Sequence, residues 1–156
     1  MKTNYLLLLA LLSLALMTPA SMAATHEHGA TPGGHEMAME QGQMIMLGDQ
    51  VVDGVKAEAQ LNDVKTAMAR MGMQETHHLM FQFQETGTGK TVEKGTAALK
   101  IKGPDNVESA PISLMGMGGH FGADIVLGAV GLYKFTIGTR LMDGKTRQFE
   151  FSYELK

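Results

Sequence analysis

The stretch that decides the fold is Thr76-His77-His78-Leu79-Met80-Phe81-Gln82-Phe83-Gln84. Hydrophobic and polar residues alternate along it, which places every second side chain on the same side of an extended chain. One side then carries the large hydrophobic side chains, namely Leu79, Phe81 and Phe83. This alternation is typical of a β-strand that has one face in a hydrophobic core.

The two adjacent histidines of this stretch point to opposite faces of such a strand. His77 shares the side of the phenylalanines, and His78 shares the side of Met80. One metal ion would therefore take only one of them, unless a bulge re-aims its neighbour. The sequence leaves the choice between His77 and His78 open.

The same alternation recurs on both sides of this stretch, and turn residues separate the repeats. The further strand-like segments are 55–61, 96–102, 121–127, 133–141 and 149–155. Residues 86–91 predict a hairpin loop, and Asp143-Gly144 predicts another. About seven strands arranged in this way predict an all-β fold, an antiparallel immunoglobulin-like or cupredoxin-like sandwich.

One short helical segment is expected after the strand at 55–61. Val64, Met68 and Met71 recur at helix spacing, and Gly72 is placed to end the helix. We expect these methionines, and Met73 beside them, to pack rather than to bind metal.

A second informative stretch is Met115-Gly116-Met117-Gly118-Gly119-His120-Phe121-Gly122-Ala123-Asp124-Ile125. On a strand, Met115 and Met117 share one face, and the two following glycines allow the backbone to turn His120 back toward them. Thioether and imidazole ligands suit copper better than magnesium or calcium; they favour Cu(I), with Cu(II) open through the imidazoles. The candidate metal ligands are therefore His77, His78, Met115, Met117 and His120.

The N-terminus has the features of an export signal. Lys2 precedes an apolar run from Tyr5 to Met17, and small residues follow up to Ala23. The run is too short to span a bilayer, so we expect a signal peptide at 1–23, cleavage after Ala23 and a periplasmic protein without a membrane span.

Residues 24–48 read as a flexible tail, followed by one sandwich domain at 49–156. Three of the six histidines lie in this tail, interspersed with methionines. Short His-rich tracts are associated with metal binding. The expected secondary tail sites are His26, His28, His35, Met37 and Met39.

Composition excludes several classes of function. The chain has no cysteine, so thiolate metal sites and a cysteine nucleophile are excluded. Its net charge is −3, and no basic block is present, which disfavours nucleic acid as a partner. Asp124 lies four residues after His120, but no serine nearby suggests a catalytic triad, and we expect no enzyme.

The segment from Met117 through Gly-Gly-His120-Phe-Gly-Ala-Asp124-Ile, followed by Gly131-Leu-Tyr133, resembles two groups of exported bacterial sandwich proteins. One is the YtkA-like family, and the other comprises periplasmic metal-binding proteins that accompany high-affinity iron uptake. The second group binds copper through His and Met on an immunoglobulin-like fold. The resemblance implies that Met117 and His120 are ligands and that Gly131 and Tyr133 open the next strand.

Together these features predict an exported protein that carries or buffers copper in the periplasm. The competing interpretation is a non-catalytic interaction module that docks on a membrane transporter or an oxidase subunit, because methionine-rich surfaces also form adaptable protein interfaces.

Overall fold

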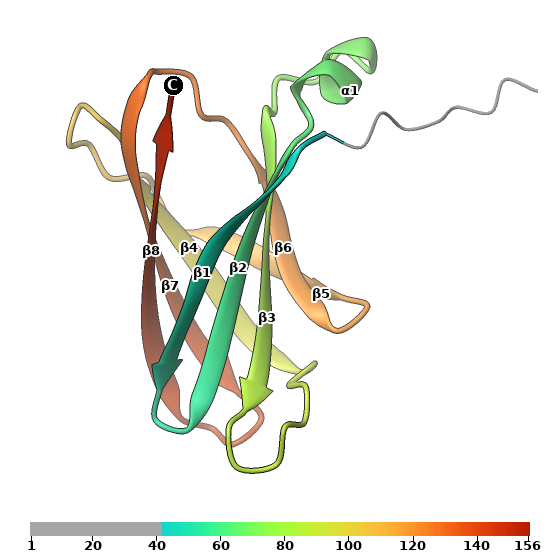
Figure 1. Ribbon diagram of the computed structural model, residues 1–156, viewed down its shortest axis with the longest axis vertical. Helices are drawn as coiled ribbons and strands as arrows, with labels where there is room; N and C mark the ends of the chain where they lie inside the picture. Colours follow the sequence, from blue (N-terminus) through green and yellow to red (C-terminus); the bar gives the residue numbers. More distant parts are fainter. Residues whose placement is uncertain (1–41) are drawn as a thin grey trace, which may run out of the picture. The chain divides into compact units, whose positions relative to one another are not determined.

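The structure is a computed structural model that describes residues 42–156. This part of the chain forms eight β-strands and one short helix (Figure 1). In chain order they are β1 (Met44–Val52), β2 (Val55–Asp63), α1 (Lys65–Arg70), β3 (His77–Glu85), β4 (Gly95–Lys102), β5 (Ile112–Met117), β6 (His120–Ile125), β7 (Gly131–Leu141) and β8 (Thr146–Leu155).

The strands follow the order β1-β2-β3-β6-β5-β4-β7-β8, and all neighbours are antiparallel. The strands form two layers, one of β1, β2, β3 and β6 and the other of β4, β7 and β8. Strand β5 belongs to both layers, because Ile112–Leu114 pairs with β4 whereas Met115–Met117 pairs with β6. The first and last strands also meet, where the Glu150 amide donates to Gln50 Oε1 at 2.8 Å. The predicted all-β antiparallel fold with one short helix is confirmed.

The inner faces of the strands form one hydrophobic core. The predicted alternation is confirmed on β3, where Leu79, Phe81 and Phe83 are fully buried. The ring of Phe83 lies 5.5 Å from the rings of both Phe121 and Phe149, so the two layers meet through aromatic side chains.

Strand β1 begins at Met44, within the range 24–48 that was predicted to be a flexible tail. Ile45 and Leu47 are half-buried against the core, but the alternation breaks at Gly48, where the pairing register shifts. Gly48 has a φ of +105°, which only glycine adopts at little cost. Because the bulge interrupts the alternation of hydrophobic and polar residues, the sequence pattern did not predict this strand.

The loop at 86–91 turns as predicted but does not join two paired strands. The Val92 amide donates to the Phe83 carbonyl at 2.8 Å, so the turn itself is hairpin-like. Strand β4 then pairs with β5 and β7 rather than with β3. The predicted hairpin turn is therefore confirmed by the antiparallel bridge between Gln84 and Thr91, but the pairing ends there because β6 lies beside the rest of β3.

Helix α1 buries fewer methionine side chains against the core than the sequence predicted. Gly72, with a φ of +75°, ends it as predicted. Met71 and Met73 are 63% and 42% exposed, so the expectation that these two side chains pack into the fold is wrong. A helix of only six residues is too short to carry Met71 over the core. No helix within residues 42–156 is long and apolar enough to cross a membrane.

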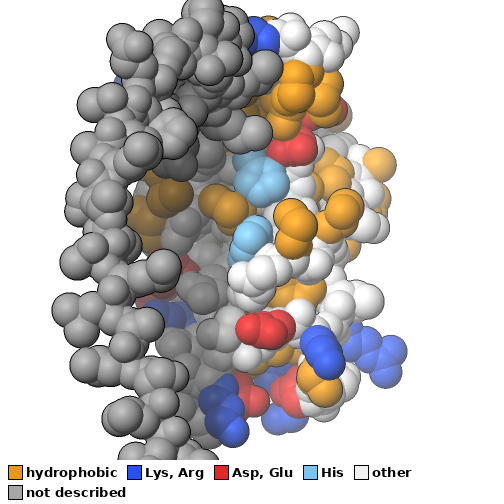
Figure 2. Space-filling model, turned by 90° about the vertical axis from the view of Figure 1, so that its right-hand side faces the viewer, with side chains coloured by type: hydrophobic (Ala, Val, Ile, Leu, Met, Phe, Trp, Pro, Cys, Tyr) orange, Lys and Arg blue, Asp and Glu red, His pale blue; other side chains and the backbone are white. Residues whose placement is uncertain are grey.

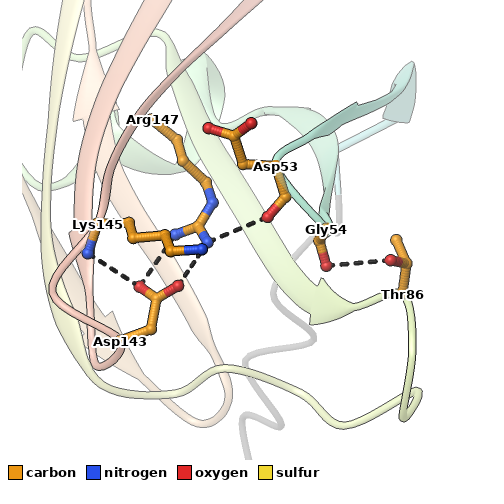
Figure 3. A network of polar contacts seen from close by, with 6 residues as sticks. All are labelled: Asp53, Gly54, Thr86, Asp143, Lys145 and Arg147. Atoms are coloured by element: carbon orange, nitrogen blue, oxygen red, sulfur yellow. Dashed lines mark hydrogen bonds and ion pairs between the residues drawn. The ribbon is translucent and has the colours of Figure 1, made fainter.

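A network of polar contacts connects two turns at one end of the sandwich, the β1–β2 turn and the β7–β8 turn (Figure 3). The buried Arg147 guanidinium donates to the Asp143 carboxylate and, at 3.2 Å, to the Asp53 carbonyl. The turn between β7 and β8 is thereby tied to the turn between β1 and β2. This hydrogen-bonded ion pair lowers the pKa of Asp143 to about 2 and raises the pKa of Arg147.

Candidate metal site

The outer faces of β3, β6 and β5 lie side by side and carry the candidate ligands. Met80 on β3 pairs with Gly122 on β6, and Gly122 pairs in turn with Met115 on β5. Two residue pairs further along, Met117 lies opposite His120. Directly opposed side chains in neighbouring strands are within contact distance of each other. The topology therefore gathers thioethers and an imidazole from segments that are distant in the sequence.

Gly122 lies in the middle of this group of side chains, between Met80 on β3 and Met115 on β5. A Cβ atom placed on it would lie 3.0 Å from His78 Nε2, so the imidazole of His78 occupies the space above the glycine. The same Cβ atom would lie 3.1 Å from the Leu79 carbonyl oxygen. A larger residue at this position would displace the imidazole. The absence of a side chain at Gly122 is therefore what allows His78 Nε2 to lie over β6, next to the row in which Met80, Gly122 and Met115 pair.

Asp124 fixes the orientation of His78. His78 Nδ1 and Asp124 Oδ1 are 2.6 Å apart, and the two residues are paired across β3 and β6. A carboxylate accepts the Nδ1 proton, which leaves the lone pair of the neutral ring on Nε2. This is the arrangement in which a carboxylate orients a metal-binding histidine. The free nitrogen of His78 is thus directed to the space above Gly122.

The hairpin between β5 and β6 places His120. Gly118 and Gly119 have φ values of +59° and +86°, so two residues in left-handed conformation make the turn. Such a turn brings Met117 opposite His120, as their register shows. His120 is half-buried and, with Met80, lines a small cavity of about 150 Å³.

The thioethers of β5 are open to solvent. Met115 is 72% exposed and Met117 is 66% exposed, whereas His78 and Met80 are half-buried. Figure 2 shows two histidine side chains next to each other on one face, with hydrophobic side chains on either side. A metal ion can reach this face without any movement of the core.

His77 lies apart from this group, on the inner face of β3. Its side chain is buried, its Nδ1 is 2.8 Å from Thr76 Oγ1, and its ring lies 6.1 Å from the ring of Tyr153. Burial lowers the pKa of His77. Of the two adjacent histidines that the sequence left open, the structure places only His78 beside Met80.

Three residues near the ligands were not named as site residues from the sequence: Met80, Gly122 and Asp124. The shared parity of His78 and Met80 was a usable signal for Met80. Gly122 and Asp124 become meaningful only through the register between β3 and β6. The expected tail ligands His26, His28, His35, Met37 and Met39 lie outside the described residues.

The donors of this site are soft. Within residues 42–156 no three His, Asp or Glu side chains gather in a group that could hold a metal ion. The candidate site depends on methionine sulfur instead, together with two imidazoles. Thioethers are poor ligands for magnesium and calcium and good ligands for Cu(I). The donor set therefore fits a copper ion.

Comparison with known proteins places the fold. No protein-family model matches the sequence, and no curated protein matches it. A copper-bound variant of FetP from uropathogenic Escherichia coli strain F11 has a similar structure, with a TM-score of 0.54 and 17% identity. The match covers 73% of this chain and 92% of that chain.

A DUF4426 family protein from Pseudomonas aeruginosa PAO1 is also similar, with a TM-score of 0.52 and 14% identity. That match covers 69% of this chain and 94% of the other. At these identities the likeness establishes a shared fold. The resemblance to YtkA-like proteins stays a prediction.

Proposed function

We propose that this protein is an exported, non-catalytic copper-binding protein that carries or buffers Cu(I) in the periplasm. The observation that carries this proposal is the gathering of soft donors around Gly122. The ligands, at most about four for one Cu(I) ion, would be drawn from His78 and Met80 of β3, His120 of β6, and Met115 and Met117 of β5. The five donors come from three neighbouring strands whose pairing places them on one face.

The chemistry of these donors favours a carrier over a permanent cofactor site. Thioethers bind without losing a proton, and they are weaker ligands than thiolates. Two of them lie exposed at the surface, where an acceptor protein can replace them one at a time. The imidazoles must be neutral to bind, so protons compete with the metal for these two ligands, and we expect the affinity to fall at acidic pH.

Two further observations support the proposal. The similar structure of FetP was determined with copper bound, so a protein of this fold accommodates that metal. The apolar N-terminal run of the sequence is the feature that suggests export, although residues 1–23 lie outside the described structure.

The test is an anaerobic Cu(I) titration of residues 24–156 against a chromogenic chelator. We expect one tightly bound ion. Replacing two facing ligands in the double variant Met117→Leu/His120→Phe should weaken this binding by more than about 100-fold, because the loss of a residue that merely orients a ligand already costs up to that much.

The control for this titration is Met71→Leu/Met73→Leu, an exposed methionine pair beside α1. It should bind copper as the wild type does. Full affinity in the Met117/His120 variant would move the tight site out of the sandwich and overturn the assignment.

A second candidate function is a docking module for a membrane transporter or an oxidase subunit. One observation favours it: Val107 and Val126, which are 64% and 56% exposed, line an open depression of about 550 Å³ at the end of the sandwich near Tyr133. A wild-type protein that binds no Cu(I) in the titration would favour this function over copper transport.

A further inference from the structure

We infer that Met44 and Met46 form a second soft-metal site on the outer face of β1, free of histidine, which stages metal for the site around Gly122. Metal binding by Met44 and Met46 does not depend on the proposed function. The staging role does rest on the proposed function, because it requires the site around Gly122 to bind copper.

Strand geometry places the two thioethers together. Residues two apart in a strand lie on the same face with about 6.7 Å between their Cα atoms. Met44 and Met46 are 58% and 54% exposed, and Ile45 between them is half-buried against the core. Each methionine side chain has three rotatable bonds, so both sulfur atoms can reach one ion above the strand.

The register places this pair in line with the first site. Met46 pairs with Gln60, which pairs with Met80. Met44 pairs with Asn62, which pairs with His78. Neighbouring strands are about 4.8 Å apart, so β1 lies about 10 Å from β3 across β2. The two sets of donors are therefore separate sites on one continuous face.

The path between the two sites carries no positive charge. The β2 residues in these two rows are Gln60 and Asn62, both neutral amides, and the next residue beyond His78 is Asp124. A cation that leaves Met44 and Met46 meets neither lysine nor arginine along these rows. The opposite edge of the same face, on β5, presents a second pair with the same spacing, Met115 and Met117.

The β1 site has no histidine, and this determines which metal ions it can bind. Two thioethers bind soft monovalent ions such as Cu(I) and Ag(I), whereas Cu(II) prefers nitrogen and oxygen donors. With two thioethers and no imidazole, this site should hold its ion more weakly than the site around Gly122, which offers more donors and two nitrogen ligands. A weaker site at the edge of the face is suited to delivery of the metal.

The test follows the methionine methyl groups of residues 24–156 by NMR during titration with Ag(I), with signals assigned by single Met→Leu substitutions. We expect the methyl signals of Met44 and Met46 to shift after those of Met115 and Met117. The exposed lone methionine Met142 serves as the control, and its signal should stay in place.

The double variant Met44→Leu/Met46→Leu should keep the Cu(I) affinity of the first site and load several-fold more slowly from a Cu(I)–chelator complex. Loading at the wild-type rate would overturn the staging role.

Unmoved Met44 and Met46 signals beside shifted Met115 and Met117 signals would overturn the second site and leave the proposed function intact. Shifts at Met44 and Met46 alone would support the second site while removing the proposed function.

Discussion

At the scale of single residues, adjacent histidines on one strand have opposite surroundings. His78 faces Gly122 and the thioethers, whereas His77 is buried beside Tyr153. We expect His78→Gln to weaken Cu(I) binding by at least about 10-fold, because it removes one nitrogen ligand. His77→Gln should leave the affinity unchanged even if it lowers stability. Chelator competition on both variants measures this, and an equal loss in both would contradict the assignment of His78.

In the proposed site, Asp124 would act on the metal through its contact with His78 Nδ1. Asp124→Asn keeps the shape of the side chain but replaces a charged acceptor with a neutral one, so the Nδ1 proton of His78 is held less firmly. Loss of such an orienting partner typically costs about 10–100-fold in metal affinity. We expect a decrease in that range in Cu(I) titrations. Asp49→Asn, an exposed aspartate on β1, is the control. Wild-type affinity in Asp124→Asn would show that His78 needs no orienting carboxylate.

Residue parity was readable from the sequence, but residue neighbours were not. Alternation alone separates His77 from His78 and groups His78 with Met80. The contact between His78 and Asp124 joins residues 46 positions apart, and no local pattern encodes that pairing. The role of Gly122 is equally hidden, because a glycine in a strand has many explanations until its neighbours are known.

At the scale of elements, the Arg147 network ties two turns together and gives the fold a defined acid sensitivity. Because Arg147 lowers the pKa of Asp143 to about 2, the carboxylate is more acidic in the folded chain than in the unfolded chain. The pair therefore contributes stability that is fully present above about pH 4 and is lost as the pH falls toward about 2.

Urea unfolding at several pH values tests this contribution. We expect Asp143→Asn to be less stable than the wild type at about pH 5, because it leaves the buried Arg147 guanidinium without its carboxylate. The difference should shrink as the pH approaches about 2, where the wild-type carboxylate is also protonated. Asp105→Asn, in the loop after β4, is the control. A difference that stays constant across this pH range would contradict the linkage.

Most elements followed from alternation because hydrophobic side chains in these strands face one core. Strand β3 and strands β7 and β8 have long uninterrupted patterns and were predicted. Strand β1 was missed because its bulge at Gly48 shifts the period by one residue. The methionines at its start then looked like part of the tail.

At the scale of the whole molecule, the candidate site exists because β6 lies between β3 and β5. Chain order would suggest β4 beside β3, but β4 belongs to the other layer. Most pairings join strands that are consecutive in the chain, but β3 with β6 and β4 with β7 are not consecutive, and no local sequence pattern encodes those two pairings. The grouping of the candidate ligands around Gly122 was therefore predictable only as a cluster at one end of a sandwich.

Metal binding by the predicted tail and metal binding by the sandwich domain can be measured separately with a deletion. A chain that begins at Gly42 keeps all eight described strands, together with Met44 and Met46. We expect it to bind one Cu(I) ion as tightly as residues 24–156 do, because all the candidate ligands around Gly122 are retained. Additional equivalents held by His26, His28, His35, Met37 and Met39 should disappear from the stoichiometry.

The position of the cut matters for this experiment. A deletion that extended through Met46 would remove the start of an edge strand whose Ile45 packs against the core, and lost binding could then reflect lost folding. Far-ultraviolet circular dichroism and thermal unfolding of the chain from Gly42 establish that it is folded. If this folded chain bound no Cu(I), the tight site would lie in residues 24–41, and the face around Gly122 would have another role.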